Sequence, residues 1–260
     1  MSRPVVHLRR LAAVVCGLVL VQLPVRAAVL IHEYALRGTL DDNMGGPPLS
    51  AFGGDITALG YVFAANQGVS FSSRAFNPAN YSIEFSFKLS SPAGSTKLLD
   101  FHHLTSDPGL YLQNNRLSFN PAIARGVTDV QAGIDMHVVL TRDGATDLVT
   151  AYVNGEAQFS FHDDLSLAAP PGFSNKVSFF LTDGNDLNAS GGTLNYLRVF
   201  NGALTGGEVS ALFANGPPAA IPEPPAIVLL TLGSASAFVW TWRRRRQRSA
   251  APRAEDGKCS

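Results

Sequence analysis

Cysteine is nearly absent from this sequence. The two cysteines among 260 residues are Cys16 and Cys259, close to opposite ends of the chain. The long stretch between them can form no internal disulfide, so it must be stabilised by a hydrophobic core. The body of the chain at residues 28–216, with about 190 residues, is long enough to bury that core without covalent cross-links.

Charge is also scarce, and basic charge is unevenly distributed. Only 15% of the residues are charged, with 20 basic residues against 20 acidic ones. Eleven of the basic residues precede residue 27 or follow residue 242, which leaves 9 basic and 18 acidic side chains between, a net charge of −9. This region lacks the basic surface that phosphate contacts require, which excludes nucleic acid as a partner.

The motifs of several enzyme classes are missing. The sequence contains no Gly-x-Ser-x-Gly elbow, no His-Glu-x-x-His helix, no glycine-rich phosphate loop and no candidate cysteine nucleophile. We therefore name no catalytic residue.

Residues 1–27 have the composition of a secretory signal peptide. Basic residues precede an apolar run at residues 11–23, and the small residues Ala27 and Ala28 are suited to cleavage. A buried core helix is the alternative, but the order of charge, apolar run and small residues is typical of processing. We expect cleavage by signal peptidase and export of the body of the chain.

The C-terminal part divides by composition into three segments. Residues 217–225 form a proline-rich linker, residues 226–242 contain no charged residue, and residues 243–260 form a basic tail. The uncharged segment would span about 25 Å as a helix, slightly less than a hydrocarbon core of about 30 Å. It predicts a short transmembrane helix, whose basic flank stays in the cytoplasm by the positive-inside rule.

Three elements stand in a fixed order at this end of the chain. They are the motif Pro222, Glu223 and Pro224, then the apolar helix, then the cluster Arg243, Arg244, Arg245 and Arg246. This order resembles the PEP-CTERM sorting signal of Gram-negative bacteria. The resemblance implies recognition by an exosortase and transfer from the inner membrane to the cell surface or extracellular matrix. A plain C-terminal membrane anchor is the alternative.

Alternation with period two dominates residues 28–216. It is longest at residues 81–89, where apolar and polar residues alternate as in a strand with one solvent-exposed face. Shorter runs lie at residues 29–36, 69–71, 97–101, 110–112, 116–119, 136–141, 148–153, 157–161, 177–181 and 194–200. Ten to twelve strands separated by turn residues predict an all-β antiparallel sandwich or barrel.

Two local signals give the positions of a hairpin and a helix. Asn154 and Gly155 accept the positive φ angles of a type I′ turn between two strands. Thr205 and Glu208 have capping-box spacing, which predicts one short helix ending before Asn215. This helix is expected to dock through Val209, Leu212 and Phe213.

Several segments then resemble a known family, in the order in which that family has them. They are Tyr34-Ala35-Leu36, residues 60–63, the strand at 81–89, and residues 137–144, 151–155 and 197–209. They are similar to laminin-G-like and concanavalin-A-like lectin/glucanase domains, which implies a jelly-roll β-sandwich over residues 28–216. This fold carries lectins, adhesins, hydrolases and structural modules, so the resemblance leaves function open.

A glucanase of this fold carries paired carboxylates, in a pattern such as Glu-x-Asp-x-x-Glu, as acid and nucleophile. Glu84 is instead the single carboxylate of its strand, with Ser82 and Ser86 on the same face. We therefore expect a non-enzymatic lectin-like domain that binds glycan or extracellular polysaccharide. The alternatives are a structural or adhesive surface protein without glycan specificity and, third, a polysaccharide hydrolase.

The densest group of oxygen ligands lies in the loop with Asp183, Asp186 and Asn188. Calcium takes six to eight such oxygens, and in laminin-G-like domains it lies at a loop rim. The N-terminal loops offer Asp41, Asp42 or Asp55 as further ligands, and we name Asp183, Asp186, Asn188, Asp41 and Asp55 as candidates for calcium. An ordinary turn between strands is the alternative.

A second cluster contains His102 and His103 with Asp100 and Asp107. Neighbouring strand residues point to opposite faces, so both histidines could bind one metal only where the backbone bends. A polar rim after the strand is the simpler interpretation. For stacking on a sugar ring the candidates are Tyr61, Tyr111 and Tyr196, with core packing as the alternative for each.

Overall fold

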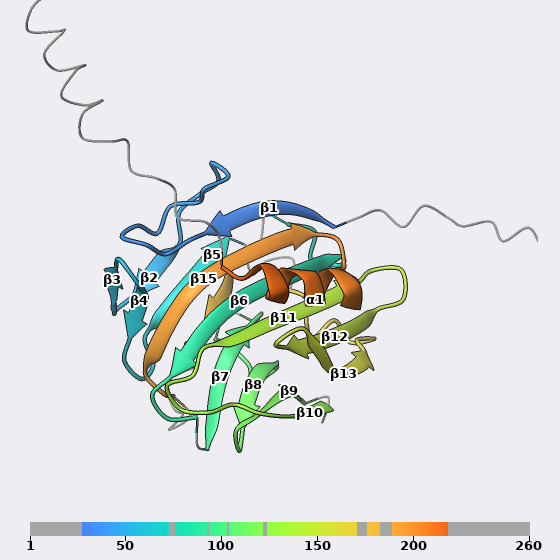
Figure 1. Ribbon diagram of the computed structural model, residues 1–260. Coiled ribbons are helices and arrows are strands. Elements are labelled where there is room, and N and C mark those ends of the chain that lie inside the picture. Colours follow the sequence, from blue (N-terminus) through green and yellow to red (C-terminus); the bar gives the residue numbers. More distant parts are fainter. Residues whose placement is uncertain are drawn as a thin grey trace, which may run out of the picture.

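Figure 1 shows the computed structural model of the chain. The structure describes residues 28–72, 76–92, 94–102, 104–121, 124–170, 176–182 and 189–217. The predicted signal peptide, the transmembrane helix with its basic tail, and the whole sorting motif lie outside these residues. No helix in the described part is long and apolar enough to cross a membrane.

Two antiparallel sheets pack face to face. Sheet A contains, in spatial order, β13 (Glu156–His162), β12 (Leu148–Val153), β11 (Met136–Asp143), β6 (Tyr81–Leu89), β15 (Gly192–Asn201), β4 (Gly60–Phe63) and β3 (Asp55–Thr57), and β1 (Val29–Tyr34) also pairs with β15. Sheet B contains β10 (Ala124–Asp129), β9 (Arg116–Asn120), β8 (Gly109–Gln113), β7 (Ser95–Asp100), β14 (Lys176–Phe179), β5 (Gly68–Ser72) and β2 (Ser50–Phe52). The described chain is thus the all-β antiparallel sandwich expected from the sequence, consistent with a jelly roll.

Aromatic rings from both sheets fill the core. The rings of Phe85 on β6 and Phe179 on β14 meet edge to face with centroids 5.5 Å apart, and Phe180 stacks on Phe63 of β4 at 4.5 Å. All four side chains are buried. Such offset and edge-to-face contacts add to the stability that comes from removing the rings from water.

Each run with predicted period two coincides with a strand, but four further strands were missed. These are β2, β3, β4 and β10. β2 is exposed at all three of its positions, and β3 is exposed or half-buried throughout, so neither has the buried apolar face that produces an alternating signal. The run at 177–181 also ends early, because Phe180 has a φ of 61° and leaves the strand.

The predicted turn and helix are both present. Asn154 and Gly155 have φ angles of 51° and 83°, as a type I′ turn requires. The helix α1 (Gly206–Asn215) is capped by Thr205, whose hydroxyl accepts from the Glu208 amide while the Glu208 carboxylate accepts from the Thr205 amide. Figure 1 shows α1 lying across the outer face of sheet A.

Apolar side chains cover one part of the outer face of sheet A. Val139, Tyr152 and Phe200 on the strands pack with Leu204 and Val209 as a second hydrophobic cluster. The expectation of a solvent-exposed polar face on the strand at 81–89 was therefore wrong, since Ser82 and Glu84 are completely buried. Ser82 contacts Gly202 and Leu204, where the chain returns over this face, and Glu84 is enclosed by side chains of β11 and β15. Strand periodicity reports neither kind of cover.

Candidate functional site

A pocket of about 410 Å³ lies on the outer face of sheet A, beside the part covered by α1. Its walls come from three places: the segment after β1, the turn between β3 and β4, and the end of α1. The residues are Ala35, Arg37, Leu59, Phe213, Gly216 and Pro217. Its floor is formed by outward-facing residues of β6, β11 and β15. The volume is in the range of small-molecule sites.

The pleat of three neighbouring strands explains why the floor is polar. Alternation along β6 places Ser82, Glu84, Ser86 and Lys88 on the outer face. The antiparallel register sets Arg198 of β15 opposite Glu84, and His137 of β11 and Tyr196 of β15 opposite Ser86. The polar residues of three strands therefore gather at one place.

A bulge in β15 adds one more polar group. The register shifts between Leu194 and Tyr196, so Asn195 has no partner residue on β6. Asn195 and Tyr196 consequently both line the pocket. The Asn195 amide donates to Ser86 Oγ at 3.1 Å and to Asp135 Oδ1 at 2.9 Å, which fixes the position of its side chain.

Glu84 is the centre of the buried network beneath this floor. Its Oε1 lies 3.0 Å from His137 Nε2, 3.1 Å from the Tyr196 hydroxyl and 3.4 Å from an Arg198 guanidinium nitrogen. The side chain of Glu84 has no exposed surface. The desolvation of this carboxylate is thus compensated by three donors from two strands.

Arg198 joins Glu84 to a second carboxylate. Its Nε donates to Glu33 Oε1 at 2.9 Å, and Asn43 Nδ2 donates to the other oxygen of Glu33 at 3.2 Å. The guanidinium also lies 5.3 Å from the centroid of the Tyr196 ring, within the range of a cation–π contact. Arg198 therefore lies between two carboxylates and against an aromatic face.

The environment of Tyr196 keeps its hydroxyl protonated. Burial raises the pKa of Tyr196 first, and the charge and hydrogen bond of Glu84 raise it further, well beyond the usual value near 10. At physiological pH this hydroxyl is a neutral donor to Glu84 and not an acid. It orients the ring that lines the pocket.

His137 has one ring nitrogen with a partner and one without. A carboxylate can only accept, so the bond to Glu84 assigns the proton to Nε2. Nδ1 is buried and has no hydrogen-bond partner among the described residues. In the neutral ring this nitrogen is an acceptor, and His137 is one of the residues that line the pocket.

Phe213 forms the exposed aromatic wall of the pocket. Its ring centroid lies 5.6 Å from that of His137, and its side chain is 46% exposed. The sequence predicted that Phe213 docks α1 together with Val209 and Leu212. The structure agrees with this docking: Val209 is buried, Leu212 packs on the second cluster, and Phe213 lies against His137 and Gly155 while nearly half of it stays exposed.

Two other pockets, of about 520 and 460 Å³, lack this combination of groups. In the larger one, Arg142 is held by Asp147, Asp163 and the carbonyl of Ala79, and His102 Nε2 lies 3.2 Å from the Leu167 carbonyl oxygen. Arg142 and His102 of this larger pocket are thus held by contacts within the fold. Of these three pockets, only the one on sheet A joins a buried polar atom without a partner among the described residues to an exposed aromatic ring.

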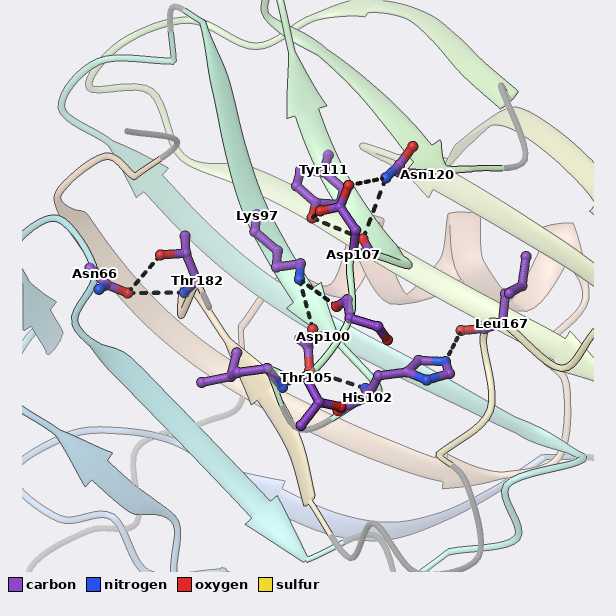
Figure 2. A network of polar contacts seen from close by, with 12 residues as sticks. Asn66, Lys97, Asp100, His102, Thr105, Asp107, Tyr111, Asn120, Leu167 and Thr182 are labelled. Carbon is purple, nitrogen blue, oxygen red and sulfur yellow. Dashed lines mark hydrogen bonds and ion pairs between the residues drawn. The ribbon is translucent and has the colours of Figure 1, made fainter. Parts of the chain in front are cut away.

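Figure 2 shows the second predicted cluster, on the side of sheet B. Asp100 accepts from Lys97 Nζ at 2.8 Å and from the backbone amides of His102 and Leu104. Asp107 instead accepts from Tyr111 and Asn120. These contacts fit the polar-rim interpretation, and His103 lies outside the described residues.

The calcium candidates are only partly described. Asp41 accepts from the Thr39 hydroxyl two residues away, Asp55 lies exposed on β3, and Asp183, Asp186 and Asn188 lie outside the described residues. Within the described part, no group of three or more histidine, cysteine, aspartate or glutamate residues could hold a metal ion. These residues alone do not form a calcium site, and the predicted site stays a prediction.

The tyrosine candidates divide between core and pocket. Tyr61 belongs to the central core, and its hydroxyl donates to the carbonyls of Gly53 and Gly68. Tyr111 is buried with its hydroxyl on Asp107. Only Tyr196 lines the pocket. Sequence reasoning missed His137 and Arg198 as members of the site, although each lies at an outward position of an alternating strand.

Comparison with known proteins agrees with this architecture. The family described as the concanavalin A-like lectin/glucanases superfamily matches residues 63–210. No curated protein sequence matches the chain.

Solved structures show the same fold at low sequence identity. A sialidase of Trypanosoma rangeli, in complex with 2,3-difluorosialic acid, is 14% identical over 73% of this chain with a TM-score of 0.56, and this chain covers one third (33%) of its length. A second similar structure is domain 4 of AbnA, a GH43 extracellular arabinanase from Geobacillus stearothermophilus, in complex with arabinotriose. It is 18% identical, and the match covers 71% of this chain and 98% of that domain with a TM-score of 0.50. The botulinum neurotoxin serotype D binding domain is 14% identical, with 72% of this chain and 52% of that one covered at a TM-score of 0.54.

The fold is thus shared by glycoside hydrolases and by binding domains. The family match extends over more than half of the chain. This chain belongs to the concanavalin A-like lectin/glucanase superfamily.

Proposed function

We propose that this chain is an exported, non-enzymatic protein that binds carbohydrate in the pocket on the outer face of sheet A. The observation that carries the proposal is the arrangement of Phe213 and Tyr196 beside His137, whose Nδ1 has no hydrogen-bond partner among the residues that the structure describes. Sugar recognition needs an apolar ring face and polar partners for hydroxyl groups. This pocket offers both in a volume of about 410 Å³.

The contacts of Glu84 and Glu33 favour a role in sugar binding over one in sugar hydrolysis. A glycosidase needs two carboxyl groups that reach the glycosidic oxygen and the anomeric carbon. Glu84 is fully enclosed by its three donors, and Arg198 bridges it to Glu33. Neither carboxylate is arranged to donate a proton to a sugar or to attack one.

Two of the similar structures contain a sugar, 2,3-difluorosialic acid in the sialidase and arabinotriose in the arabinanase domain. At identities of 14% and 18% these likenesses concern the fold. They support carbohydrate as the class of ligand, while the pocket described above supplies the residues.

The two ends of the chain support a location outside the cytoplasm. The signal-peptide pattern at residues 1–27 favours export through signal peptidase. The Pro222-Glu223-Pro224 motif, the apolar segment and the arginine cluster favour an exosortase as processing partner, with the inner membrane as an intermediate location. The natural ligand would then be an extracellular polysaccharide at the surface of a Gram-negative bacterium.

The proposal is tested by measuring the affinity of the full-length chain for polysaccharide fragments by calorimetry. Phe213→Ala should weaken binding roughly fivefold to tenfold, because an aromatic contact of about 1 kcal/mol is lost. Phe52→Ala is the matched control, since Phe52 is similarly exposed but lies in sheet B. Equal affinities for the two variants would exclude this pocket, and release of new reducing ends during incubation would contradict a non-enzymatic role.

A further inference from the structure

Nearly every basic side chain of the described body has a partner. Lys97, Arg116, Arg142 and Arg198 form ion pairs with carboxylates. Arg125 donates to the Gln113 carbonyl, and Lys176 lies over the Phe52 ring. Of the lysines and arginines among the described residues, only Arg37 and Lys88 make no ion pair, side-chain hydrogen bond or ring contact.

These two cations line the same pocket. Lys88 projects from the outer face of β6 and is half-buried, while Arg37 lies exposed in the segment after β1. Two cations that line one pocket and form no ion pair favour an anionic partner between them.

The other charges near the pocket do not neutralise them. Asp135 is the single carboxylate in its wall, and Asn195 holds one of its oxygens. The charges of Glu84 and Glu33 are matched by Arg198 beneath the floor. The pocket thus has a surplus of positive charge in a region of the chain whose net charge is −9.

We propose that the sugar bound in this pocket is acidic, and that Arg37 and Lys88 pair with its carboxylate or sulfate group. The inference rests on the proposed function and adds the class of sugar. Guanidinium and ammonium groups form charge-assisted hydrogen bonds with both kinds of anion. Phe213 and Tyr196 then contact the ring of the sugar, and His137 Nδ1 accepts from one of its hydroxyl groups.

The experiment compares ligands that differ in the anionic group. The full-length chain is titrated with trigalacturonate, with its methyl ester, with neutral galactotriose and with a sulfated galactotriose. We expect an acidic trimer to bind at least about tenfold more tightly than the ester and the neutral trimer, and to lose this advantage in high salt. The stronger of the two acids identifies the anion.

Variants that remove one positive charge test whether Arg37 and Lys88 cause the preference for acidic trimers. Arg37→Met and Lys88→Met keep the apolar stem and should each remove most of the preference for the acid. Arg125→Met is the control, because Arg125 is also exposed but lies on β10 of sheet B. A preference that survives in both pocket variants would overturn the assignment of Arg37 and Lys88.

The remaining outcomes separate this inference from the proposed function. Neutral and acidic trimers that bind equally well would overturn the acidic specificity and leave carbohydrate binding intact. No binding of any sugar would overturn the proposed function and this inference with it. Hexaglutamate that binds as tightly as trigalacturonate, with no binding of the neutral trimer, would identify an acidic-peptide site and contradict the inference.

Discussion

His137 Nε2 lies 3.0 Å from Glu84 Oε1, and this contact joins β11 to β6 on the outer face of sheet A. The two residues are not directly opposite each other, since His137 faces Ser86 and Glu84 faces Val139 in the register. Their bond runs diagonally across the strand pair. It fixes the tautomer of His137 and thereby leaves Nδ1 as an acceptor that has no hydrogen-bond partner within the described part of the chain.

We expect Glu84→Gln to destabilise the fold by roughly 3 kcal/mol, because Arg198 loses the negative charge of its buried partner and the amide group brings an NH2 donor among three groups that already donate. Urea unfolding of the variant measures this difference. Glu156→Gln is the control, since Glu156 is exposed on β13 and should change the stability by less than about 0.5 kcal/mol. Equal stabilities of the two variants would show that the Glu84 network contributes nothing to the fold.

Thr205→Ala should lower the free energy of unfolding by about 1 kcal/mol, because the amide of Glu208 loses its acceptor at the start of α1. Thr205→Ser keeps the hydroxyl and should stay near the wild-type value. Since α1 carries Phe213, the alanine variant should also weaken sugar binding slightly. A stability unchanged by Thr205→Ala in thermal unfolding would show that the cap is not needed.

The lowered pKa of Asp42 predicts that the folded protein loses stability in acid. Burial alone would raise the pKa of Asp42, but the hydrogen bonds from His32 and from the amides of Glu33 and Met44 outweigh it, so the pKa is lowered. A lowered pKa means that the contribution is fully present above the usual aspartate value of about 3.9 and is lost as the pH falls through the folded value.

The wild type should therefore exceed Asp42→Asn in stability at pH 7, and the gap should narrow below about pH 4. Thermal unfolding of both proteins across this range measures the effect. A gap that stays constant down to pH 2 would contradict the role of the ionised carboxylate.

The raised pKa values of the buried tyrosines predict that the folded protein loses stability in strong alkali. Burial is the largest cause that raises the pKa of five tyrosines, Tyr34, Tyr61, Tyr81, Tyr152 and Tyr196, and for Tyr61 the value reaches about 12. Because the folded pKa is raised, the contribution is complete below the unfolded value near 10 and declines as the pH rises above it.

Absorbance titration of tyrosinate should accordingly show most of the six tyrosines ionising together with unfolding above about pH 11. Independent titration of these residues near pH 10 in the folded protein would contradict their burial.

The sequence was sufficient for the sandwich but not for the site. Alternation placed Ser82, Glu84 and Ser86 on one face, and the structure confirms that placement. The partners of Glu84 come from residues 53 and 114 positions away, His137 and Arg198. Period two reports which face a residue occupies, but it does not report which strands become neighbours.

The hairpin and the helix could likewise each be predicted from neighbouring residues, whereas the contact between them could not. Asn154-Gly155 and the Thr205 cap are local signals, and both are confirmed. That the two elements meet was not predictable: Ser210 Oγ donates to the Gly155 carbonyl at 2.9 Å, and a Cβ at Gly155 would lie 3.3 Å from Phe213. This contact sets α1 on sheet A and leaves Phe213 at the edge of the pocket.

The account is tested most directly by an aromatic NMR spectrum of the chain with labelled phenylalanine and tyrosine, recorded during titration with trigalacturonate and with the neutral trimer. Binding in the pocket on sheet A should shift the ring signals of Phe213 and Tyr196 and leave those of Phe52 and Tyr111 unchanged. Shifts confined to the rings of sheet B, or no shift with either sugar, would contradict a carbohydrate site beside α1.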